Sequence, residues 1–213
     1  MKGNVMSFLK NFFSQTKKPQ GFLGRMMVSS MNSGHAPMAA WGTARLPLLA
    51  PKHIVDLGCG GGQNAANLLQ KYPASHVTAV DYSEVSVQKA EQKNAAEISG
   101  GRCQVLQGDV SALSLDSGSF DLATAFETIY FWPGPLHSFR EVFRILKPQG
   151  YFLIVNECDG TNPKDQKWVD MIDGMTIYSK SQIMDYLKAA GFSSVEVTHD
   201  QKKHWICFLA QKP

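Results

Sequence analysis

Short apolar runs alternate with amphipathic segments through the middle of the chain. Five of these runs are rich in Val, Ile, Leu, Phe and Ala and carry little charge, which is typical of strands buried on both faces of a parallel sheet. The runs are His53–Leu57, Val77–Asp81, Cys103–Gln107, Phe120–Phe126 and Tyr151–Asn156. The pattern therefore predicts five strands of one sheet between residues 52 and 157.

Helical segments lie between these runs. We expect helices at Gln63–Lys71, Ser83–Ile98 and Pro135–Leu146, the second of which opens on a serine of the N-cap type. Residues 147–150, which follow the third helix, read Lys-Pro-Gln-Gly. Proline at the second position and glycine at the fourth predict a type I turn that leads into the next strand.

The end of the chain predicts a helix and a hairpin. The helix is expected at Ser179–Ala190, ended by Gly191, and the hairpin strands at Ser194–Thr198 and His204–Ala210. Strands that alternate with helices indicate an α/β fold. We expect a doubly wound, mostly parallel sheet with the hairpin at one edge.

Two segments outside this alternation are harder to interpret. Residues 1–50 show no clean period, and we expect a short helical cover over the binding site, with the domain proper at 51–213. Trp41 in this cover either packs over the ligand or anchors the cover to the sheet. The polar insert 157–178 carries Trp168, Met171 and Met175 at helical spacing. The apolar side chains of this insert either bury one helix face or line a pocket.

Composition and charge weigh against several kinds of partner. Lys and Arg are scattered over 213 residues with a net charge of +3, so nucleic acid is not an expected partner. No apolar stretch is long enough to span a membrane. The four cysteines lie far apart, which argues against a zinc site or a disulfide scaffold. We therefore expect no metal, and free thiols in a cytoplasmic protein.

A glycine-rich turn follows the first predicted strand. Glycines at 58, 60, 61 and 62 allow a sharp turn and let a ligand approach the backbone at the carboxyl edge of the sheet. A nucleotide P-loop string is absent, and Gln63 replaces the third glycine of a dinucleotide fingerprint. The acid before the turn, Asp56, suits an ammonium group better than a pyrophosphate.

Two further acids follow the next strands. Asp81 ends the second strand, where an acid can accept hydrogen bonds from both ribose hydroxyls of an adenosine. This position alone does not separate a nicotinamide cofactor from S-adenosylmethionine. Asp109 follows the third strand in Gly108-Asp109-Val110, where a carboxylate can accept a hydrogen bond from the adenine amino group.

Together with Phe120-Asp121 and Leu146-Lys147-Pro148-x-Gly150, these motifs resemble the class I, seven-stranded S-adenosylmethionine-dependent methyltransferases. The resemblance is strongest to small-molecule enzymes of the ubiquinone-biosynthesis type, and its motifs cover about residues 50–160. It implies a Rossmann-like sheet with one antiparallel strand near the C-terminus. It also implies these cofactor contacts: Asp56, Gly58 and Gly60 with the methionine part, Asp81 with the ribose, Tyr82, Asp109 and Val110 with the adenine, and Glu127 beside the sulfonium.

The methyl acceptor is expected beside the loop 127–134, which carries three consecutive aromatic residues. Tyr130 is expected to face the pocket, whereas Phe131 and Trp132 either stack on a flat acceptor or pack beneath the following helix. Methyl transfer needs mainly orientation, and a base only where the acceptor must lose a proton. The catalytic candidates are Tyr130, His35 and Glu127.

The sequence thus predicts an enzyme that moves a methyl group from S-adenosylmethionine to a small-molecule acceptor and releases S-adenosylhomocysteine, as a monomer or homodimer. Two alternatives remain open at this point. One is an S-adenosylmethionine-binding protein without catalysis, and the other is a nucleotide-cofactor oxidoreductase. The acceptor atom is not predicted, because none of the motifs reaches the acceptor side.

Overall fold

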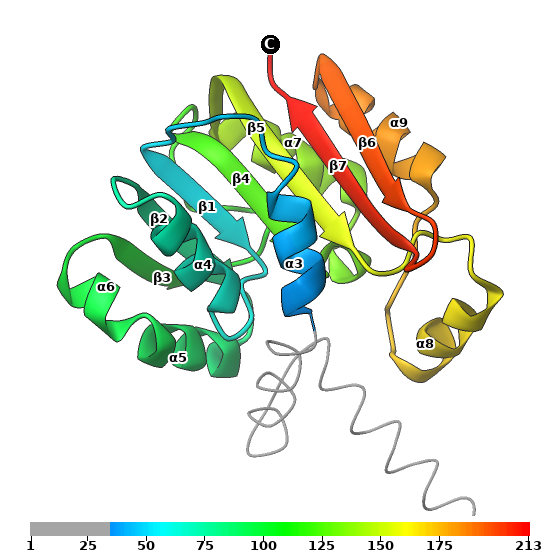
Figure 1. Cartoon of the computed structure of the whole chain (residues 1–213), viewed down its shortest axis with the longest axis horizontal. Helices are drawn as coiled ribbons and strands as arrows, with labels where there is room; N and C mark the ends of the chain where they lie inside the picture. Colours follow the sequence, from blue (N-terminus) through cyan, green and yellow to red (C-terminus); the bar gives the residue numbers. More distant parts are fainter. Residues whose placement is uncertain (1–34) are drawn as a thin grey trace, which may run out of the picture.

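Seven strands form one sheet in the computed structural model, which describes residues 35–213 (Figure 1). The strand order is β3-β2-β1-β4-β5-β7-β6, and every neighbouring pair is parallel except the two that β7 makes. The expected mostly parallel α/β sheet with an antiparallel C-terminal strand is therefore confirmed. The strands are β1 (His53–Leu57), β2 (His76–Asp81), β3 (Cys103–Gln107), β4 (Phe120–Phe126), β5 (Leu146–Asn156), β6 (Ser194–Asp200) and β7 (Trp205–Gln211).

Helices cover both faces of this sheet (Figure 1). One face carries α3 (Ala36–Thr43), α4 (Gln63–Lys71), α5 (Glu84–Lys93) and the short α6 (Ala95–Ser99), and the other carries α7 (Pro135–Ile145) and α9 (Lys180–Ala190). The 3₁₀ turns η1 (Ile129–Phe131) and η2 (Pro163–Asp165) and the short helix α8 (Gln166–Met171) belong to the connecting segments. The parallel strands all end at the lower edge in Figure 1, so the loops that follow them meet there.

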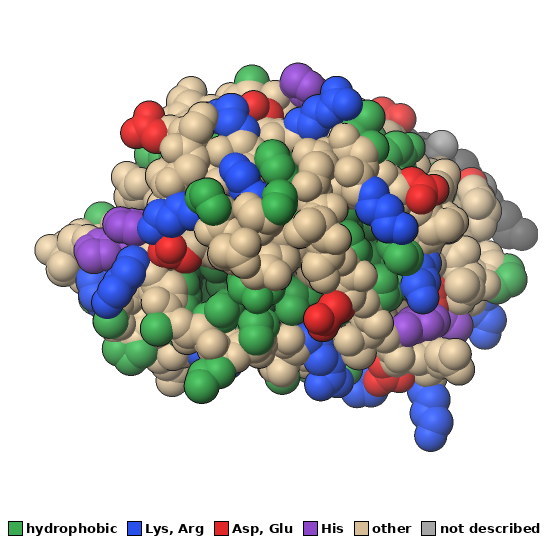
Figure 2. All heavy atoms as spheres, turned by 90° about the horizontal axis from the view of Figure 1, so that it is seen from above, with side chains coloured by type: hydrophobic (Ala, Val, Ile, Leu, Met, Phe, Trp, Pro, Cys, Tyr) green, Lys and Arg blue, Asp and Glu red, His purple; other side chains and the backbone are tan. Residues whose placement is uncertain are grey.

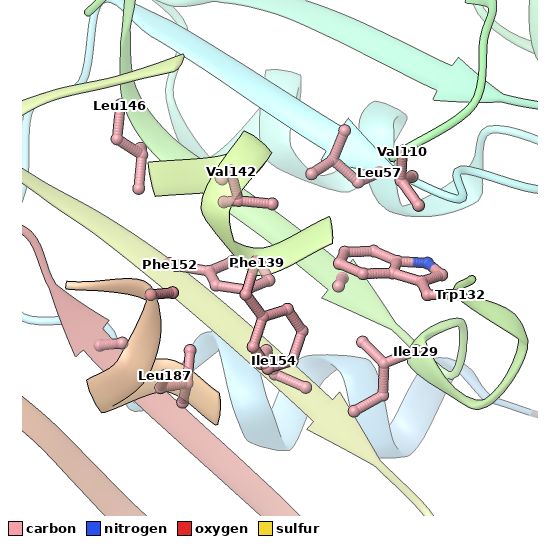
Figure 3. Packing of buried hydrophobic residues seen from close by; sticks show 14 of the residues in the cluster. Leu57, Val110, Ile129, Trp132, Phe139, Val142, Leu146, Phe152, Ile154 and Leu187 are labelled. Carbon is pink, nitrogen blue, oxygen red and sulfur yellow. The ribbon is translucent and has the colours of Figure 1, made fainter. Parts of the chain in front are cut away.

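Successive side chains along each strand point to opposite faces of the sheet and so contribute to two separate buried cores. In β1, Ile54 packs with α3 and α4, whereas Val55 and Leu57 pack with α7. Aromatic rings fill the α7 core (Figure 3), where Trp132 stacks on Phe152 with ring centroids 6.2 Å apart and meets the edge of Phe139 at 5.9 Å. Packing beneath the following helix, one of the two interpretations of Trp132, is therefore confirmed.

The predicted helix at Ser83–Ile98 is wrong as a single element, because it breaks at Asn94 into α5 and α6. The buried Asn94 amide donates hydrogen bonds to the carbonyls of Gly62, at 3.1 Å, and of Ala90, at 2.9 Å. Its side chain thereby ties the helix to the glycine turn, and its backbone leaves helical geometry at φ −105°.

The predicted turn at 147–150 is also corrected, because β5 already begins at Leu146. Leu146 pairs with Phe120, and the register shifts before Leu122 pairs with Tyr151. The residue that absorbs the irregularity is Gln149, at φ +64°. The Pro-Gly signal therefore marks a bulge in a longer strand, which is the usual place for a strand proline.

The helix after the insert follows the sequence pattern closely. Ser179 Oγ accepts a hydrogen bond from the Gln182 N–H, and Gln182 Oε1 accepts one from the Ser179 N–H, so α9 begins with a capping box. The helix ends at Gly191, which adopts the left-handed conformation at φ +113°. These terminal residues fix the ends of α9 as predicted.

The structure describes residues 35–50 of the expected cover, which include helix α3, whereas residues 1–34 lie outside the described residues. The helix lies close to β5 because Gly42 has no side chain: a Cβ there would lie 2.3 Å from Cγ2 of Val155. Trp41 packs against Trp205 of β7, with ring centroids 5.9 Å apart. Trp41 therefore anchors the cover to the sheet, which was the second of its two interpretations.

The surface charge and the lengths of the helices bear on possible partners. On the face shown in Figure 2, Lys and Arg side chains lie among acidic and uncharged ones and form no continuous basic patch on that face. None of the helices within residues 35–213 is long and apolar enough to cross a membrane.

Candidate functional site

The glycine turn bends the chain at the carboxyl end of β1. Gly58, Gly60 and Gly62 have φ values of +71°, +53° and +76°, which side chains rarely adopt. At Gly58 a Cβ would also lie 2.0 Å from Thr128 Oγ1, so the turn packs tightly on the loop after β4. At Gly60 nothing lies within 4 Å of an added Cβ. The backbone of Gly60 is thus open to a ligand.

Asp81 holds this turn in place from the end of β2. Its Oδ2 accepts a hydrogen bond from the Gly60 N–H at 2.9 Å, and its Oδ1 accepts one from the Ser83 N–H at 2.9 Å. Burial raises the pKa of the Asp81 carboxyl. Hydrogen bonds from the Ser86 side chain and the Tyr82 backbone also reach the Asp81 carboxyl, which lines a cavity at this edge of the sheet.

A cavity of about 390 Å³ lies at this edge of the sheet, a size typical of small-molecule sites. Of the predicted cofactor residues, all except Asp56 line it. The lining falls into two groups. The first comes from the turn and from β2, α5 and β3: Gly58, Gly60, Asp81, Tyr82, Ser86, Gly108, Asp109 and Val110. The second comes from the end of β4 and the loop after it, with one residue from the insert: Phe126, Glu127, Thr128, Phe131, Trp132, Pro133 and Gly174.

The adenine side of the predicted site is built from exposed and buried residues together. Tyr82 is 37% exposed, whereas Val110 is buried. Asp109 Oδ1 accepts hydrogen bonds from the N–H and the hydroxyl of Ser111, at 2.8 and 2.7 Å. These bonds fix the loop after β3, so its carboxylate has a defined position at the rim of the cavity.

Asp56 lies buried on β1, just before the turn. Its Oδ1 accepts a hydrogen bond from the Thr124 hydroxyl at 2.8 Å, and its Oδ2 has no partner within the described chain. Burial raises the pKa of Asp56 to about 7. A buried carboxylate oxygen without a partner is costly, and a cationic or donor group supplied by a ligand would satisfy it.

Glu127 occupies the junction between the two lining groups, at φ +58°, an uncommon conformation for a residue with a side chain. Its Oε1 accepts hydrogen bonds from the Tyr130 hydroxyl, at 3.0 Å, and from the Glu157 N–H. Its Oε2 lies 3.8 Å from Nδ1 of His35. Burial, reinforced by the charge of Glu157, raises the pKa of Glu127 to about 8, while burial lowers the pKa of His35.

The expectation that Tyr130 faces the pocket is wrong. Its ring is buried, and its hydroxyl donates to Glu127 and accepts from the Cys158 N–H at 3.0 Å. Phe131 and Trp132 line the cavity instead. The 3₁₀ turn η1 turns the side chains of consecutive residues in different directions, which a count of aromatic residues does not reveal.

The insert buries most of its own apolar residues. Ile172 and Met175 pack with Tyr130 and Cys158, and other apolar residues of the insert flank this cluster. The insert contributes Gly174 to the cavity lining. The first interpretation of the insert, an apolar face buried against neighbouring residues, is therefore favoured over a pocket wall.

Sequence reasoning gave no role in the site to Ser86, Phe126 or Glu157. Ser86 and Phe126 line the cavity, and Glu157 lies beside Glu127 and His35. For Glu157 a signal was present, because it follows β5 just as Glu127 follows β4. The carboxyl ends of neighbouring parallel strands place such residues side by side.

Known proteins resemble this chain in sequence and in fold. Residues 55–154 match a family described as "Methyltransferase domain". This segment therefore resembles a methyltransferase domain. Its fold is that of the putative methyltransferase in the complex with the Haloferax volcanii Trm112 methyltransferase activator, with a TM-score of 0.79, 22% sequence identity, and coverage of 88% of this chain and 94% of that one.

Two curated relatives of the methyltransferase domain act in small-molecule chemistry, as their names state. The 2-methyl-6-phytyl-1,4-hydroquinone methyltransferase 1 of Oryza sativa subsp. japonica is 26% identical over 144 residues, which is 68% of this chain and 42% of the relative. The demethylmenaquinone methyltransferase of Chlamydia trachomatis is 30% identical over 117 residues, 54% of this chain and 49% of the relative. The matches thus span less than half the length of these relatives.

S-adenosylmethionine, the methyl donor of this class, fits the residues of the methyltransferase domain. The backbone of Gly60 is open, and the carboxylate of Asp81 lines the cavity beside it. Asp56, whose Oδ2 has no partner among the described residues, is buried just before the same turn and does not line the cavity. The nicotinamide alternative gains no support from the family match or from these relatives.

Proposed function

We propose that this chain transfers the methyl group of S-adenosylmethionine to a small-molecule acceptor and releases S-adenosylhomocysteine. The observation that carries the proposal is a single cavity lined by both groups of residues, the cofactor motifs and the aromatic loop after β4. A methyl donor and its acceptor must share such a space for an in-line displacement.

The proposed cofactor contacts follow the hydrogen bonds already in place. The ribose hydroxyls donate to the carboxylate of Asp81, which lines the cavity and is held in place by the N–H groups of Gly60 and Ser83. Asp109 accepts from the adenine amino group, with Val110 and Tyr82 packed against the ring. Asp56 and the backbone of the turn receive the methionine part, whose ammonium compensates the buried carboxylate.

The proposed acceptor is an apolar molecule that contains a ring. Phe131, Trp132 and Pro133 form an apolar and aromatic wall along the second group of lining residues. Because the Trp132 ring already stacks on Phe152, a flat acceptor ring is proposed to stack on Phe131. Two relatives named for a phytyl hydroquinone and for demethylmenaquinone support this class of acceptor.

The protein's contribution to catalysis is mainly orientation. The cofactor supplies a methyl carbon already activated by its positive sulfur. Fixing donor and acceptor in line can contribute roughly 7–11 kcal/mol to lowering the barrier. Glu127 is held rigidly by Tyr130 and Glu157 at the junction of the two lining groups. Of the three catalytic candidates, Glu127 and His35 border cavities, and Tyr130 acts as a positioning residue through Glu127.

The cellular setting belongs to the same proposal. All four cysteines are buried free thiols, which suits a reducing cytoplasm. The cavity is lined by residues of one chain, so a monomer or a homodimer supplies a complete site. No nucleic-acid or membrane partner is needed for the proposed reaction.

Methyl transfer can be tested directly with labelled cofactor. The full chain is incubated with [¹³C-methyl]S-adenosylmethionine and a metabolite extract supplemented with hydroquinones, and products are separated by mass spectrometry. We expect a product that carries one labelled methyl group, together with an equal amount of S-adenosylhomocysteine. Asp81→Asn should lose both products, whereas Asp185→Asn, an exposed acid on α9, should retain them. Binding of the cofactor with no labelled product would contradict the proposal and indicate a non-catalytic binding protein.

A further inference from the structure

His35, Glu127 and Glu157 come together although they are far apart in sequence. His35 is the N-cap of α3, and the two acids directly follow β4 and β5. One possible ligand atom from each side chain lies within 4.8 Å of the other two. A cation placed between three atoms at that spacing can lie within about 2.8 Å of all of them. Small side-chain rotations then bring each atom to the ~2.0–2.3 Å of a metal–ligand bond.

The cluster lies where two cavities meet. Glu127 lines the cavity of about 390 Å³, and His35 lines a second cavity of about 50 Å³. The two cavities share Gly58, Gly60 and Phe126. The side chains of His35 and Glu127 are 29% and 11% exposed, so this is a sheltered position and not a solvated surface.

The contacts of Glu127 leave one of its oxygens aimed at His35. Its Oε1 is occupied by the Tyr130 hydroxyl and the Glu157 N–H. Its Oε2 lies 3.8 Å from Nδ1 of His35, which is too long for a hydrogen bond. The separation is close to that of two ligands bound to one metal ion.

Negative charge at this position exceeds positive charge. The charges of Glu157 and Asp165 both act on Glu127, and its ion-pair partner is His35 and not a Lys or Arg. Asp165 Oδ2 is buried and has no hydrogen-bond partner among the described residues. Elsewhere, Glu141 is paired with Arg144 at 2.9 Å. A divalent cation at this position would compensate the carboxylates of Glu127 and Glu157, which have no Lys or Arg partner among the ion pairs of the described residues.

We propose that His35, Glu127 and Glu157 bind a divalent cation at the rim of the cavity. One imidazole nitrogen and two carboxylate oxygens suit Mn²⁺, Fe²⁺ or Zn²⁺ better than Mg²⁺, which prefers oxygen ligands alone. Three protein ligands leave coordination positions open. These positions bind hydroxyl or carbonyl oxygens on the ring of the acceptor. The role toward the acceptor rests on the proposed function, whereas cation binding does not.

The site is tested with the metal alone. Tag-free full chain is stripped with EDTA, transferred to chelator-free buffer and titrated with Mn²⁺, and free Mn²⁺ is followed by electron paramagnetic resonance. We expect one Mn²⁺ per chain, displaced by Zn²⁺. Glu157→Gln and His35→Gln should each weaken binding at least about tenfold. Glu196→Gln and His76→Gln, at exposed positions away from the cluster, should leave it unchanged.

The outcomes separate this inference from the methyl-transfer proposal. Absence of Mn²⁺ and Zn²⁺ binding, or binding that all four variants share, would overturn the cation site. If Glu157→Gln does not fold, His35→Gln decides, because His35 is a partly exposed helix-capping residue. S-adenosylmethionine binding is measured by calorimetry on the same samples. Cofactor binding without metal binding would contradict only the proposed cation site. Metal binding without cofactor binding would contradict only the proposed function.

Discussion

The backbone N–H of Gly60 donates a hydrogen bond to Oδ2 of Asp81, with the two atoms 2.9 Å apart. This bond joins the turn after β1 to the end of β2. The other oxygen of Asp81 is fixed by the Ser83 N–H. A ligand that rests on the open backbone of Gly60 therefore lies beside a carboxylate whose position is already set, so the two sequence motifs form one site.

Gly60→Ala should weaken S-adenosylmethionine binding, because a Cβ at Gly60 projects into the space where the ligand rests. The variant also strains a backbone at φ +53°, which costs about 1–2 kcal/mol of stability. Gly118→Ala is the matched control, since Gly118 has φ +64°, no atom within 4 Å of an added Cβ, and no part in the cavity lining. Calorimetry should show weaker binding for Gly60→Ala alone. Equal affinities in the two variants would contradict the placement of the ligand.

Asp56 should make the ligand-free protein less stable as pH rises. Burial raises its pKa to about 7, above the ~3.9 of an unfolded Asp. Between these values the folded state holds more protons than the unfolded state, so the free energy of unfolding falls as pH increases. Asp56→Asn should remove this fall, and its stability relative to the original chain should rise by roughly 4 kcal/mol at most from pH 4 to pH 7. Urea unfolding at several pH values measures it, and a pH-independent difference would contradict the account.

The contribution of Asp159 to the free energy of unfolding should have the opposite pH dependence to that of Asp56. Its Oδ2 bonds His199 at 2.5 Å and His204 at 3.2 Å, which ties the segment after β5 to the C-terminal hairpin. Burial alone would raise the pKa of Asp159, but hydrogen bonds from Thr161 and then from the two histidines outweigh it and lower the pKa to about 2. This stabilisation is present above about pH 4 and is lost as pH falls toward 2.

Asp159→Asn tests this interaction through acid unfolding. The original chain should be more stable than the variant at pH 6, and the difference should shrink as pH falls from 4 to 2. The exposed Asp185→Asn variant should show no such convergence. A difference between the original chain and Asp159→Asn that stays constant down to pH 2 would show that the ionised carboxylate, with its bonds from Thr161 and the two histidines, is not its source.

Most of the fold follows from local patterns. Apolar runs located the strands, and the capping box at Ser179 with Gly191 located α9, because these signals act within a few residues. The break at Asn94 was not predictable in this way. Its cause is a hydrogen bond to the Gly62 carbonyl, which is remote in sequence. Likewise, Gln149 reads as part of a turn until pairing of β5 with β4 is known.

Some residues of the site could likewise be predicted from local sequence, whereas others depend on contacts between distant segments. The carboxyl ends of parallel strands meet at one edge of the sheet, so residues that follow them lie there too. Gly60 and Asp81 could therefore be predicted to lie at this edge. The direction of the Tyr130 ring depends on η1 and on the Cys158 N–H, which the local sequence does not specify. The contact of His35 with Glu127 depends on how α3 lies against β5 and is visible only in three dimensions.

Calorimetric titration with S-adenosylmethionine and with NAD tests the central claim most directly. The original chain should bind one S-adenosylmethionine and no NAD. Asp81→Asn should weaken that binding about 10–100-fold, because it removes a charged acceptor of the ribose hydroxyls. Binding of NAD alone, or an unchanged dissociation constant for Asp81→Asn, would contradict the account.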